Sequence, residues 1–172
     1  MSLVPSISQS HKSHPSPGDR PQEAAFRALV RTLGLVDRVM EPYFARFGIS
    51  GTKWGAMRAL WRAEREGSGG LRMSELSDRL LVRPPSVTGV VDRLEREGLV
   101  ARDAAADDLR AKRVRLTPKG RRLVEQVLAV HAGQIDRVMD GLDSDEQAAF
   151  HKLLDRMCGH LQTLMDPPAN GG

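Results

Sequence analysis

The sequence predicts a mainly α-helical chain with one small β-ribbon near its middle. From residue 23 to residue 166, apolar residues recur every three or four positions, which is the spacing of amphipathic helices. Two short segments, 99–102 and 113–116, instead have the composition of strands, and in the second of them apolar and basic residues alternate. The length of 172 residues and the hydrophobic content of 40% suit one globular subunit.

The two ends of the chain are expected to be disordered tails. Residues 1–22 are rich in serine and proline and show no apolar periodicity, and residues 167–172 form a second, shorter tail. Between the tails, residues 23–50 carry the first apolar stripe at helical spacing. They predict a long helix that is bent or thinned near Pro42, because proline removes a backbone hydrogen bond.

Residues 51–117 are expected to form one compact lobe of short elements. Apolar spacing and capping residues predict three helices, with a brief strand between the first and the second. Proline is tolerated in the first turn of a helix, and glycine suits a left-handed helix stop. The expected boundaries are a Ser50 cap, a glycine-rich end at 67–70, a strand at 71–73, a Ser74 cap, a helix start at 83–86 and a stop at Gly98.

The third helix of the lobe is followed by the ribbon, whose strands at 99–102 and 113–116 are joined by the polar stretch 103–112. A helix pair followed by a β-hairpin is the winged helix-turn-helix arrangement. In that arrangement the second helix of the pair enters the major groove of DNA, and the hairpin reaches along the backbone. The lobe is therefore predicted to carry a small β-wing.

Residues 118–166 are expected to form two further long helices. Thr117 is a suitable cap for the first, and Asp143 with Glu146 makes a capping-box pattern for the second. The apolar stripes of these helices and of residues 23–50 exceed what one lobe can cover, so they are expected to pack on each other and on a second copy. The predicted architecture is a winged helix-turn-helix lobe flanked by N- and C-terminal dimerisation helices.

Charge is distributed unevenly along the chain, whose net charge is +4. Residues 72–122 carry 13 Lys and Arg against 8 Asp and Glu, whereas residues 123–172 carry 3 against 8. A basic middle segment indicates a polyanion such as nucleic acid as its partner, and the alternative is an ordinary solvated surface.

Enzymatic activity is not expected, since the sequence holds no glycine-rich phosphate loop, nucleophile elbow or H-E-x-x-H motif. A lone cysteine and the absence of an i, i+4 histidine pair argue against metal and other cofactors. Cys158 itself is interpreted as a buried or half-buried, inert thiol. No apolar run of about 18 residues and no apolar signal segment occurs, so a cytoplasmic protein without a membrane partner is expected.

Three motifs follow one another in the second half of the lobe. They are VVDRLEREGLVAR at 90–102, the pattern Asp108-x-Arg110-x-x-Arg113, and RLTPKG at 115–120. In this order and spacing they resemble the MarR family of bacterial transcription regulators, and the order of elements agrees from about residue 23 to residue 165. The resemblance implies a ligand-responsive repressor whose homodimer reads a pseudo-palindromic operator in double-stranded DNA. The alternative is a winged helix that binds proteins and has no affinity for DNA.

The candidate DNA contacts lie at the start of the second helix of the pair and in the wing. Small polar side chains at a helix N-terminus can approach phosphates and base edges, although Ser86 also suits a simple capping role. In the wing, Asp108 is expected to fix Arg110 as a minor-groove probe, the alternative being a surface salt-bridge network. The candidate DNA-binding residues are Arg83, Pro85, Ser86, Thr88, Arg93, Asp108, Arg110, Lys112 and Arg113.

The resemblance also implies a small aromatic or phenolic effector between the dimerisation helices and the lobe. An arginine beside aromatic rings suits an aromatic carboxylate through charge and stacking. The alternative is that the two tryptophans belong to the core and that the arginine is exposed. The candidate effector-binding residues are Trp54, Met57, Arg58, Trp61 and Met73.

Overall fold

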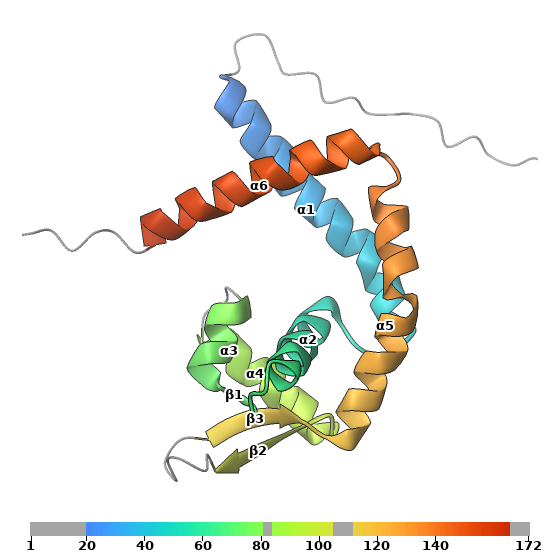
Figure 1. The fold of residues 1–172 in the computed structure, drawn as a ribbon, viewed down its shortest axis with the longest axis vertical. Coiled ribbons are helices and arrows are strands. Elements are labelled where there is room, and N and C mark those ends of the chain that lie inside the picture. Colours follow the sequence, from blue (N-terminus) through green and yellow to red (C-terminus); the bar gives the residue numbers. More distant parts are fainter. Residues whose placement is uncertain (1–19, 81–83, 105–111, 166–172) are drawn as a thin grey trace, which may run out of the picture.

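The computed structural model describes residues 20–80, 84–104 and 112–165, and in these ranges it contains six helices and three strands (Figure 1). The predicted site residues Arg83, Asp108 and Arg110 lie outside the described residues, and Pro85 and Lys112 are described by their backbone alone. The elements are α1 (Pro21–Ala45), α2 (Gly51–Arg65), β1 (Leu71–Arg72), α3 (Met73–Leu80), α4 (Pro84–Arg96), β2 (Val100–Ala104), β3 (Lys112–Leu116), α5 (Pro118–Met139) and α6 (Ser144–Met165).

The lobe consists of α2, α3 and α4 packed on a three-stranded antiparallel sheet (Figure 1). β3 lies in the middle, with β1 on one side and β2 on the other. The register pairs Leu71 with Val114 and Val100 with Leu116, and all four side chains are buried in the core. Gly70, which precedes β1, has a φ of 137°, and a Cβ there would lie 2.8 Å from the carbonyl oxygen of Val114. Only glycine therefore permits this approach of β1 to β3.

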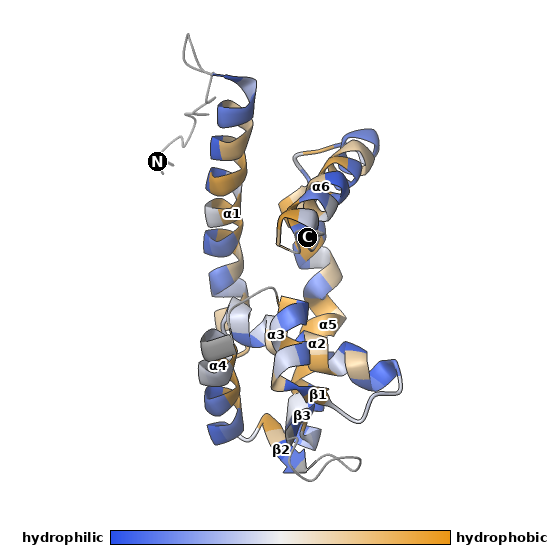
Figure 2. Cartoon of the chain, turned by 90° about the vertical axis from the view of Figure 1, so that its left-hand side faces the viewer, coloured by the Kyte–Doolittle hydropathy of each residue, from blue (hydrophilic) through white to orange (hydrophobic). Residues whose placement is uncertain are grey.

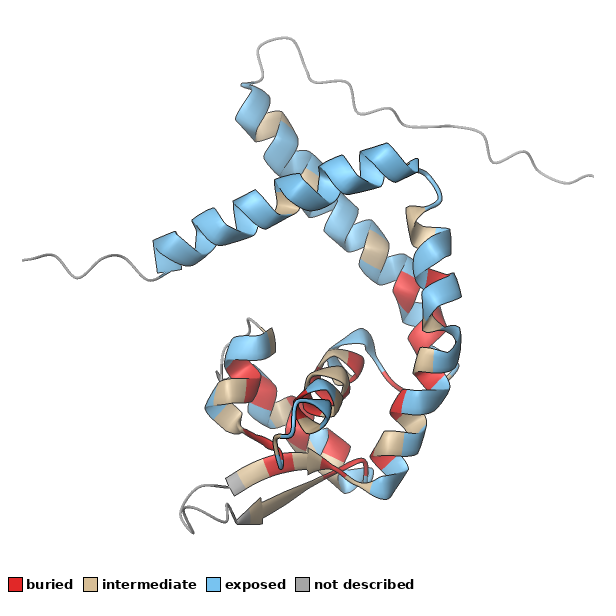
Figure 3. Ribbon diagram, viewed as in Figure 1, coloured by how far each residue is buried: buried red, intermediate tan, exposed pale blue. Residues whose placement is uncertain are grey.

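The hydrophobic core fills the space between the lobe helices, the sheet and the adjoining part of α5. Figure 3 shows that buried residues gather in the lobe and in the neighbouring ends of α1 and α5. The largest fully buried side chains are Met57, Leu60, Leu76, Leu94, Leu116, Val87, Val91, Val114, Val124 and Val127. They belong to the apolar stripes that the sequence carries at helical and strand spacing.

Most of the predicted helix ends are present. Ser50 Oγ accepts a hydrogen bond from the Lys53 N–H at 3.3 Å, which caps α2. Gly98 follows α4 with a φ of 68°, the left-handed conformation that closes a helix. Asp143 and Glu146 exchange side chain to backbone hydrogen bonds at 2.9 Å before α6, as a capping box does.

Two predicted helix starts are wrong. α3 begins at Met73, so Ser74 lies inside the helix, and Glu75 instead accepts a hydrogen bond from the Arg72 N–H at 2.7 Å. α1 begins at Pro21 rather than at residue 23, because proline at the first helical position already has a helical φ and needs no amide partner. At its other end α1 contains Pro42 and ends at Ala45.

The three long helices, α1, α5 and α6, extend beside the lobe (Figure 1), and together they are called the arm. α1 and α6 cross in the view of Figure 1 but lie apart in Figure 2, where apolar residues run along both. No residue of α6 is buried. Large apolar side chains of the arm that are exposed in the single chain are Phe26, Val30, Leu33, Leu35, Val39, Val130, Ile135, Phe150, Leu153, Met157, Leu161, Leu164 and Met165. Exposed apolar side chains in this number are characteristic of an interface with another chain.

Candidate nucleic-acid interface

α4 presents one apolar and one polar side. Its apolar residues fall at helical spacing, and Val87, Val91 and Leu94 are fully buried against the lobe. The opposite side exposes Ser86, Thr88, Arg93 and Arg96, the last two in the final turns. The α3–α4 pair with the following hairpin therefore leaves a polar helix face open to a partner.

One arginine of the hairpin pairs with two carboxylates on the flank of α4. Arg102, on β2, contacts the Asp92 carboxylate at 2.5 Å and also donates to the Glu95 carboxylate. The hydrogen bond that Arg102 donates to Asp92 raises the pKa of Arg102, and the charge of Glu95 adds to the effect. Because both carboxylates are paired, the exposed Arg93 and Arg96 determine the charge of the open face.

The C-terminal end of α4 is anchored to α5 and α2. Thr117 Oγ1 donates to the Gly98 carbonyl at 2.7 Å, and Lys119 Nζ donates to the Glu97 carbonyl at 2.8 Å. Lys53, on α2, forms an ion pair with the Glu97 carboxylate at 2.5 Å. These contacts fix the position of the C-terminal end of α4 against α5 and α2.

The hairpin holds its basic side chains by contacts within the lobe. Arg115 forms a cross-strand pair with Asp103, which raises the pKa of the guanidinium through their hydrogen bond. Arg113 Nη1 donates to the Gly70 carbonyl at 3.1 Å, next to β1. Arg113 is a predicted DNA contact, and this hydrogen bond also joins β3 to the residue that precedes β1.

Three of the predicted DNA-binding residues, Ser86, Thr88 and Arg93, are exposed on α4. Ser86 and Arg93 are seven residues apart and lie on one side of the helix, whereas Thr88 lies on another side. Sequence reasoning missed Arg102 and its two carboxylate partners. The sequence does show two acidic residues, Asp92 and Glu95, three positions apart on one helix. Their pairing with Arg102 depends on the path of β2 past α4, which the sequence does not reveal.

Four of the five predicted effector residues belong to α2, and the fifth, Met73, is the first residue of α3. Trp54 and Met57 are buried, whereas Trp61 and Met73 are half-buried. The Arg58 guanidinium lies 5.6 Å from the centre of the Trp54 ring, and its Nη1 is buried without a hydrogen-bond partner among the described residues. Burial lowers the pKa of Arg58, and the charge of Arg62 lowers it further. Arg58 thus lies beside an aromatic ring, and Trp54 itself belongs to the hydrophobic core, as the alternative interpretation of the tryptophans expected.

A cavity of about 440 Å³, the α2–α3 cavity, opens beside Arg58. Its described lining residues are Gly55, Arg58, Ala59, Arg62, Glu66, Arg79 and Leu80. Glu66 is paired with Arg79 at 3.0 Å, which leaves an excess of positive charge around the cavity. Of the five candidate effector residues, Arg58 is the one among these lining residues.

An aromatic cluster joins α1, α2 and α5 behind Trp54. Tyr43 donates to the Val127 carbonyl at 3.3 Å, and its hydroxyl lies 3.3 Å from His131 Nδ1. The His131 and Trp54 ring centres are 5.2 Å apart. Burial lowers the pKa of His131, and the charge of Arg58 adds to this effect. The cluster connects the arm to the lobe, and sequence reasoning did not single it out.

Comparison with known proteins identifies the family. The family model described as the MarR family matches residues 53–112. The HTH-type transcriptional repressor YetL of Bacillus subtilis is 32% identical over 131 residues, which are 76% of this chain and 77% of that protein. The chain belongs to the MarR family. The family prediction is confirmed, and with it a DNA-binding transcriptional regulator rather than an enzyme.

Solved structures agree with this MarR-family assignment. A probable transcriptional regulator from Pseudomonas aeruginosa matches with a TM-score of 0.70 and 25% identity, covering 80% of this chain and 99% of that one. MarR from E. coli complexed with operator DNA also has a TM-score of 0.70, at 24% identity, covering 76% of this chain and 91% of that one. The predicted fold class, mainly α with a small β-wing, is confirmed.

Cys158 departs from its predicted environment in this MarR-family chain. It is exposed in the single chain, rather than buried or half-buried, because α6 packs its side chains on no core of its own subunit. Among the described residues, no group of three or more His, Cys, Asp or Glu is placed to hold a metal ion. Within the same ranges, no helix has both the length and the apolar character that crossing a membrane requires.

Proposed function

We propose that the protein is a homodimeric repressor that binds a pseudo-palindromic operator and is released from it by a small aromatic or phenolic acid. The observation that carries the proposal is the charge distribution on α4. Its apolar side is buried, its flanking carboxylates are held by Arg102, and its remaining face is exposed and basic. Such a face suits the major groove, where phosphates border the base edges.

The proposed DNA contacts begin at the start of α4. Ser86 and Thr88 lie in the first turns, where backbone N–H groups favour a phosphate, and Arg93 lies two turns after Ser86 on an exposed side. Arg93 has no hydrogen bond or ion pair of its side chain among the described residues, so its guanidinium is available to a base or a phosphate. The remaining proposed contacts are Arg83, Pro85, Asp108, Arg110, Lys112 and Arg113.

The arm supports the dimeric part of the proposal. We assign residues 51–117 to DNA binding and α1, α5 and α6 to dimerisation, with α1 starting at Pro21. The exposed apolar side chains of α1 and α6 are of the kind that obligate interfaces bury. In a two-fold dimer the two α4 helices must be separated by one turn of DNA, about 34 Å, to enter successive major grooves.

The α2–α3 cavity supports the effector part of the proposal. Arg58, Arg62 and Arg79 line the cavity against the single carboxylate of Glu66, and this excess of positive charge suits the carboxylate of an aromatic acid. Because α2 packs against α1, α4 and α5, a ligand beside it would shift the lobe relative to the arm. A preference of about 1–3 kcal/mol for the shifted state would lower operator affinity some 5- to 150-fold.

The DNA part is tested by fluorescence anisotropy with a labelled duplex from the protein's own upstream region and a scrambled duplex of equal composition. Arg93→Gln should lose affinity, Arg110→Ala should cost about 1–3 kcal/mol on A·T-rich sites, and Lys112→Ala should weaken all duplexes alike. Arg65→Gln is the matched control, since it removes one exposed arginine from the end of α2. Binding of neither duplex by the wild type would favour a protein-interaction module instead, and equal binding of both would refute a sequence-specific operator.

The effector part is tested by calorimetry with benzoate on the free protein and on the operator complex. Benzoate should bind the free protein more tightly than the complex, because the coupling between the two ligands is reciprocal. Arg58→Ala should remove most of this affinity, and benzamide, which has no charge, should bind weakly to both forms. Equal benzoate affinity for both forms would show that the acid is not an effector.

A further inference from the structure

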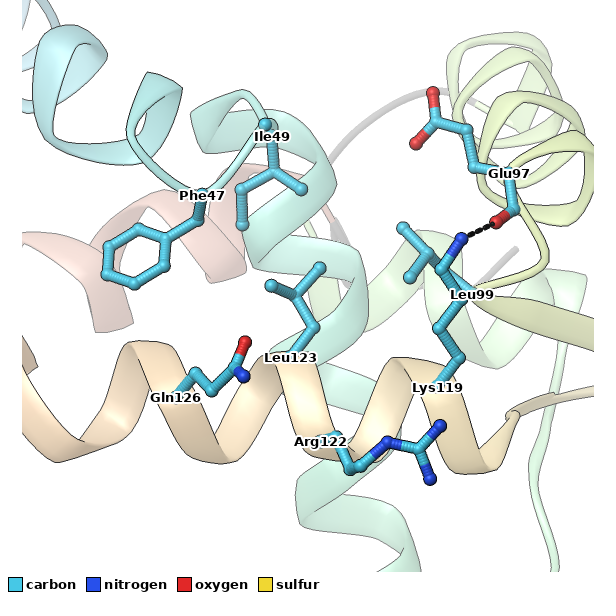
Figure 4. Close-up of a pocket in the computed structure, with 9 residues that line it drawn as sticks. Phe47, Ile49, Glu97, Leu99, Lys119, Arg122, Leu123 and Gln126 are labelled. Atoms are coloured by element: carbon cyan, nitrogen blue, oxygen red, sulfur yellow. Dashed lines mark hydrogen bonds between the residues drawn. The ribbon is translucent and has the colours of Figure 1, made fainter.

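A second cavity, the α4–α5 cavity, lies where α5 passes the end of α4 and the connection between α1 and α2 (Figure 4). Its volume is about 460 Å³, which is within the usual range for small-molecule sites. The described residues that line it are Phe47, Gly48, Ile49, Glu97, Leu99, Lys119, Arg122, Leu123 and Gln126. It shares none of these residues with the α2–α3 cavity.

One side of the α4–α5 cavity is apolar. Ile49 and Leu99 are almost completely buried, with 6% and 4% of their surface exposed, and Phe47 and Leu123 are half-buried. Figure 4 shows the four side chains around a common space, although they come from three separate parts of the chain. This arrangement provides a preformed surface for the apolar body of a ligand.

The other side of the cavity is basic. Lys119, Arg122 and Gln126 lie along one side of α5, next to Leu123. In Figure 4 Lys119 reaches towards Glu97, whereas Arg122 extends from the far edge of the α5 ribbon. The one carboxylate of the lining, Glu97, is paired with Lys53. Arg122 is exposed and has no hydrogen bond or ion pair among the described residues. The cavity therefore combines an apolar wall with an arginine that is available to an anion.

We propose that the α4–α5 cavity binds a small carboxylic acid with an apolar body. The carboxylate lies on Arg122 and Lys119, and the apolar body lies against Ile49, Leu99 and Leu123. This site is additional to the effector site proposed at Arg58, and its ligand need not contain an aromatic ring.

The site is placed to influence α4. Lys119 Nζ holds the Glu97 carbonyl at the C-terminal end of α4, and a carboxylate that takes up the ammonium group competes with this hydrogen bond. Loss of the anchor loosens the end of α4, so the bound acid weakens operator binding and the operator weakens binding of the acid. This coupling, unlike the binding of the acid, rests on the proposed function.

Calorimetry on the full-length dimer without DNA tests the site itself. The probes are octanoate, octanamide and octylamine, which share the apolar chain and differ in the head group. We expect octanoate to bind, octanamide to bind at least about tenfold more weakly, and octylamine not to bind, because a charge-assisted hydrogen bond to arginine is lost or reversed. Equal binding of the three probes would overturn the proposal.

Two variants locate the binding. Arg122→Gln should weaken octanoate by about tenfold without changing the denaturation midpoint, since the side chain is exposed. Arg65→Gln, the matched control with the same loss of charge, should leave octanoate affinity unchanged. If Arg58→Ala abolishes octanoate binding and Arg122→Gln does not, the acid binds in the α2–α3 cavity and the proposal is wrong.

A separate measurement addresses the coupling. Octanoate at saturation should lower the affinity of the wild type for its upstream duplex about fivefold or more, and should have no effect on Arg122→Gln. Octanoate binding that depends on Arg122 but leaves DNA affinity unchanged would support the site and refute its coupling to α4. A protein that binds octanoate but no DNA would refute the proposed function and leave the site in place.

Discussion

Gly120 lies where α5 closely approaches the backbone of Leu99, just before β2, and its replacement by alanine tests the packing of this junction. It is the third residue of α5, it is buried, and its N–H donates to Thr117 Oγ1 at 3.1 Å. A Cβ at this position would lie 2.0 Å from the Leu99 carbonyl oxygen and 3.2 Å from Leu116 Cδ2. The first of these neighbours is backbone and cannot rotate away.

The expected loss of stability follows from this geometry. Cβ contacts shorter than 3.0 Å are essentially never seen, so α5 and Leu99 must separate by about 1 Å. Overpacking of a core costs up to about 3 kcal/mol. We expect a cost near this upper value for Gly120, because the backbone of Leu99 cannot move aside as a side chain can. Alanine returns at most about 1 kcal/mol of helix propensity relative to glycine. The net loss for Gly120→Ala is therefore about 2 kcal/mol in the free energy of unfolding.

Urea denaturation at a fixed protein concentration, followed by the fluorescence of the two tryptophans, measures this loss. Gly89→Ala is the control, because Gly89 is inside α4 and a Cβ there meets no atom within 4 Å. That control should gain about 0.5–1 kcal/mol from helix propensity alone. If Gly120→Ala is as stable as the wild type, the contact between α5 and Leu99 is not as close as described.

Three further predictions concern the arm and its joint with the lobe. Burial and Arg58 hold the pKa of His131 below 6.5, so the unfolded chain takes up a proton first, and stability should fall as the pH drops from about 6.5 towards the pKa of the folded state. His131→Phe should remove this part of the pH dependence, and an unchanged slope in urea denaturation would contradict it. Leu161→Glu should dissociate or unfold the dimer in sedimentation experiments, whereas Gln162→Glu, on the neighbouring exposed residue, should not. Thr117→Ala should cost about 1–2 kcal/mol in the free energy of unfolding by removing the α5 cap, and Thr117→Ser should restore most of it.

Local signals predict most of the helix ends, because a cap involves residues only a few positions apart. Gly98 and the Asp143–Glu146 pair are in this class, and both have the expected geometry. The Ser74 cap failed for a local reason as well. Glu75 accepts a hydrogen bond from the Arg72 N–H, and α3 starts at Met73, two residues before the first helical residue that a Ser74 cap predicts.

The sequence by itself determined the order of the elements, the family and the exposed face of α4, since these depend on apolar period and short motifs. It did not determine which basic residues are available to a ligand. Arg102 and Arg93 lie on the same polypeptide segment, yet one is held by two carboxylates and the other is exposed. A charge is free or paired according to what the fold brings within about 4 Å of it, and these partners come from other turns and strands. Tertiary packing alone therefore decided the charge of the α4 face and the position of Arg122 beside an apolar cavity.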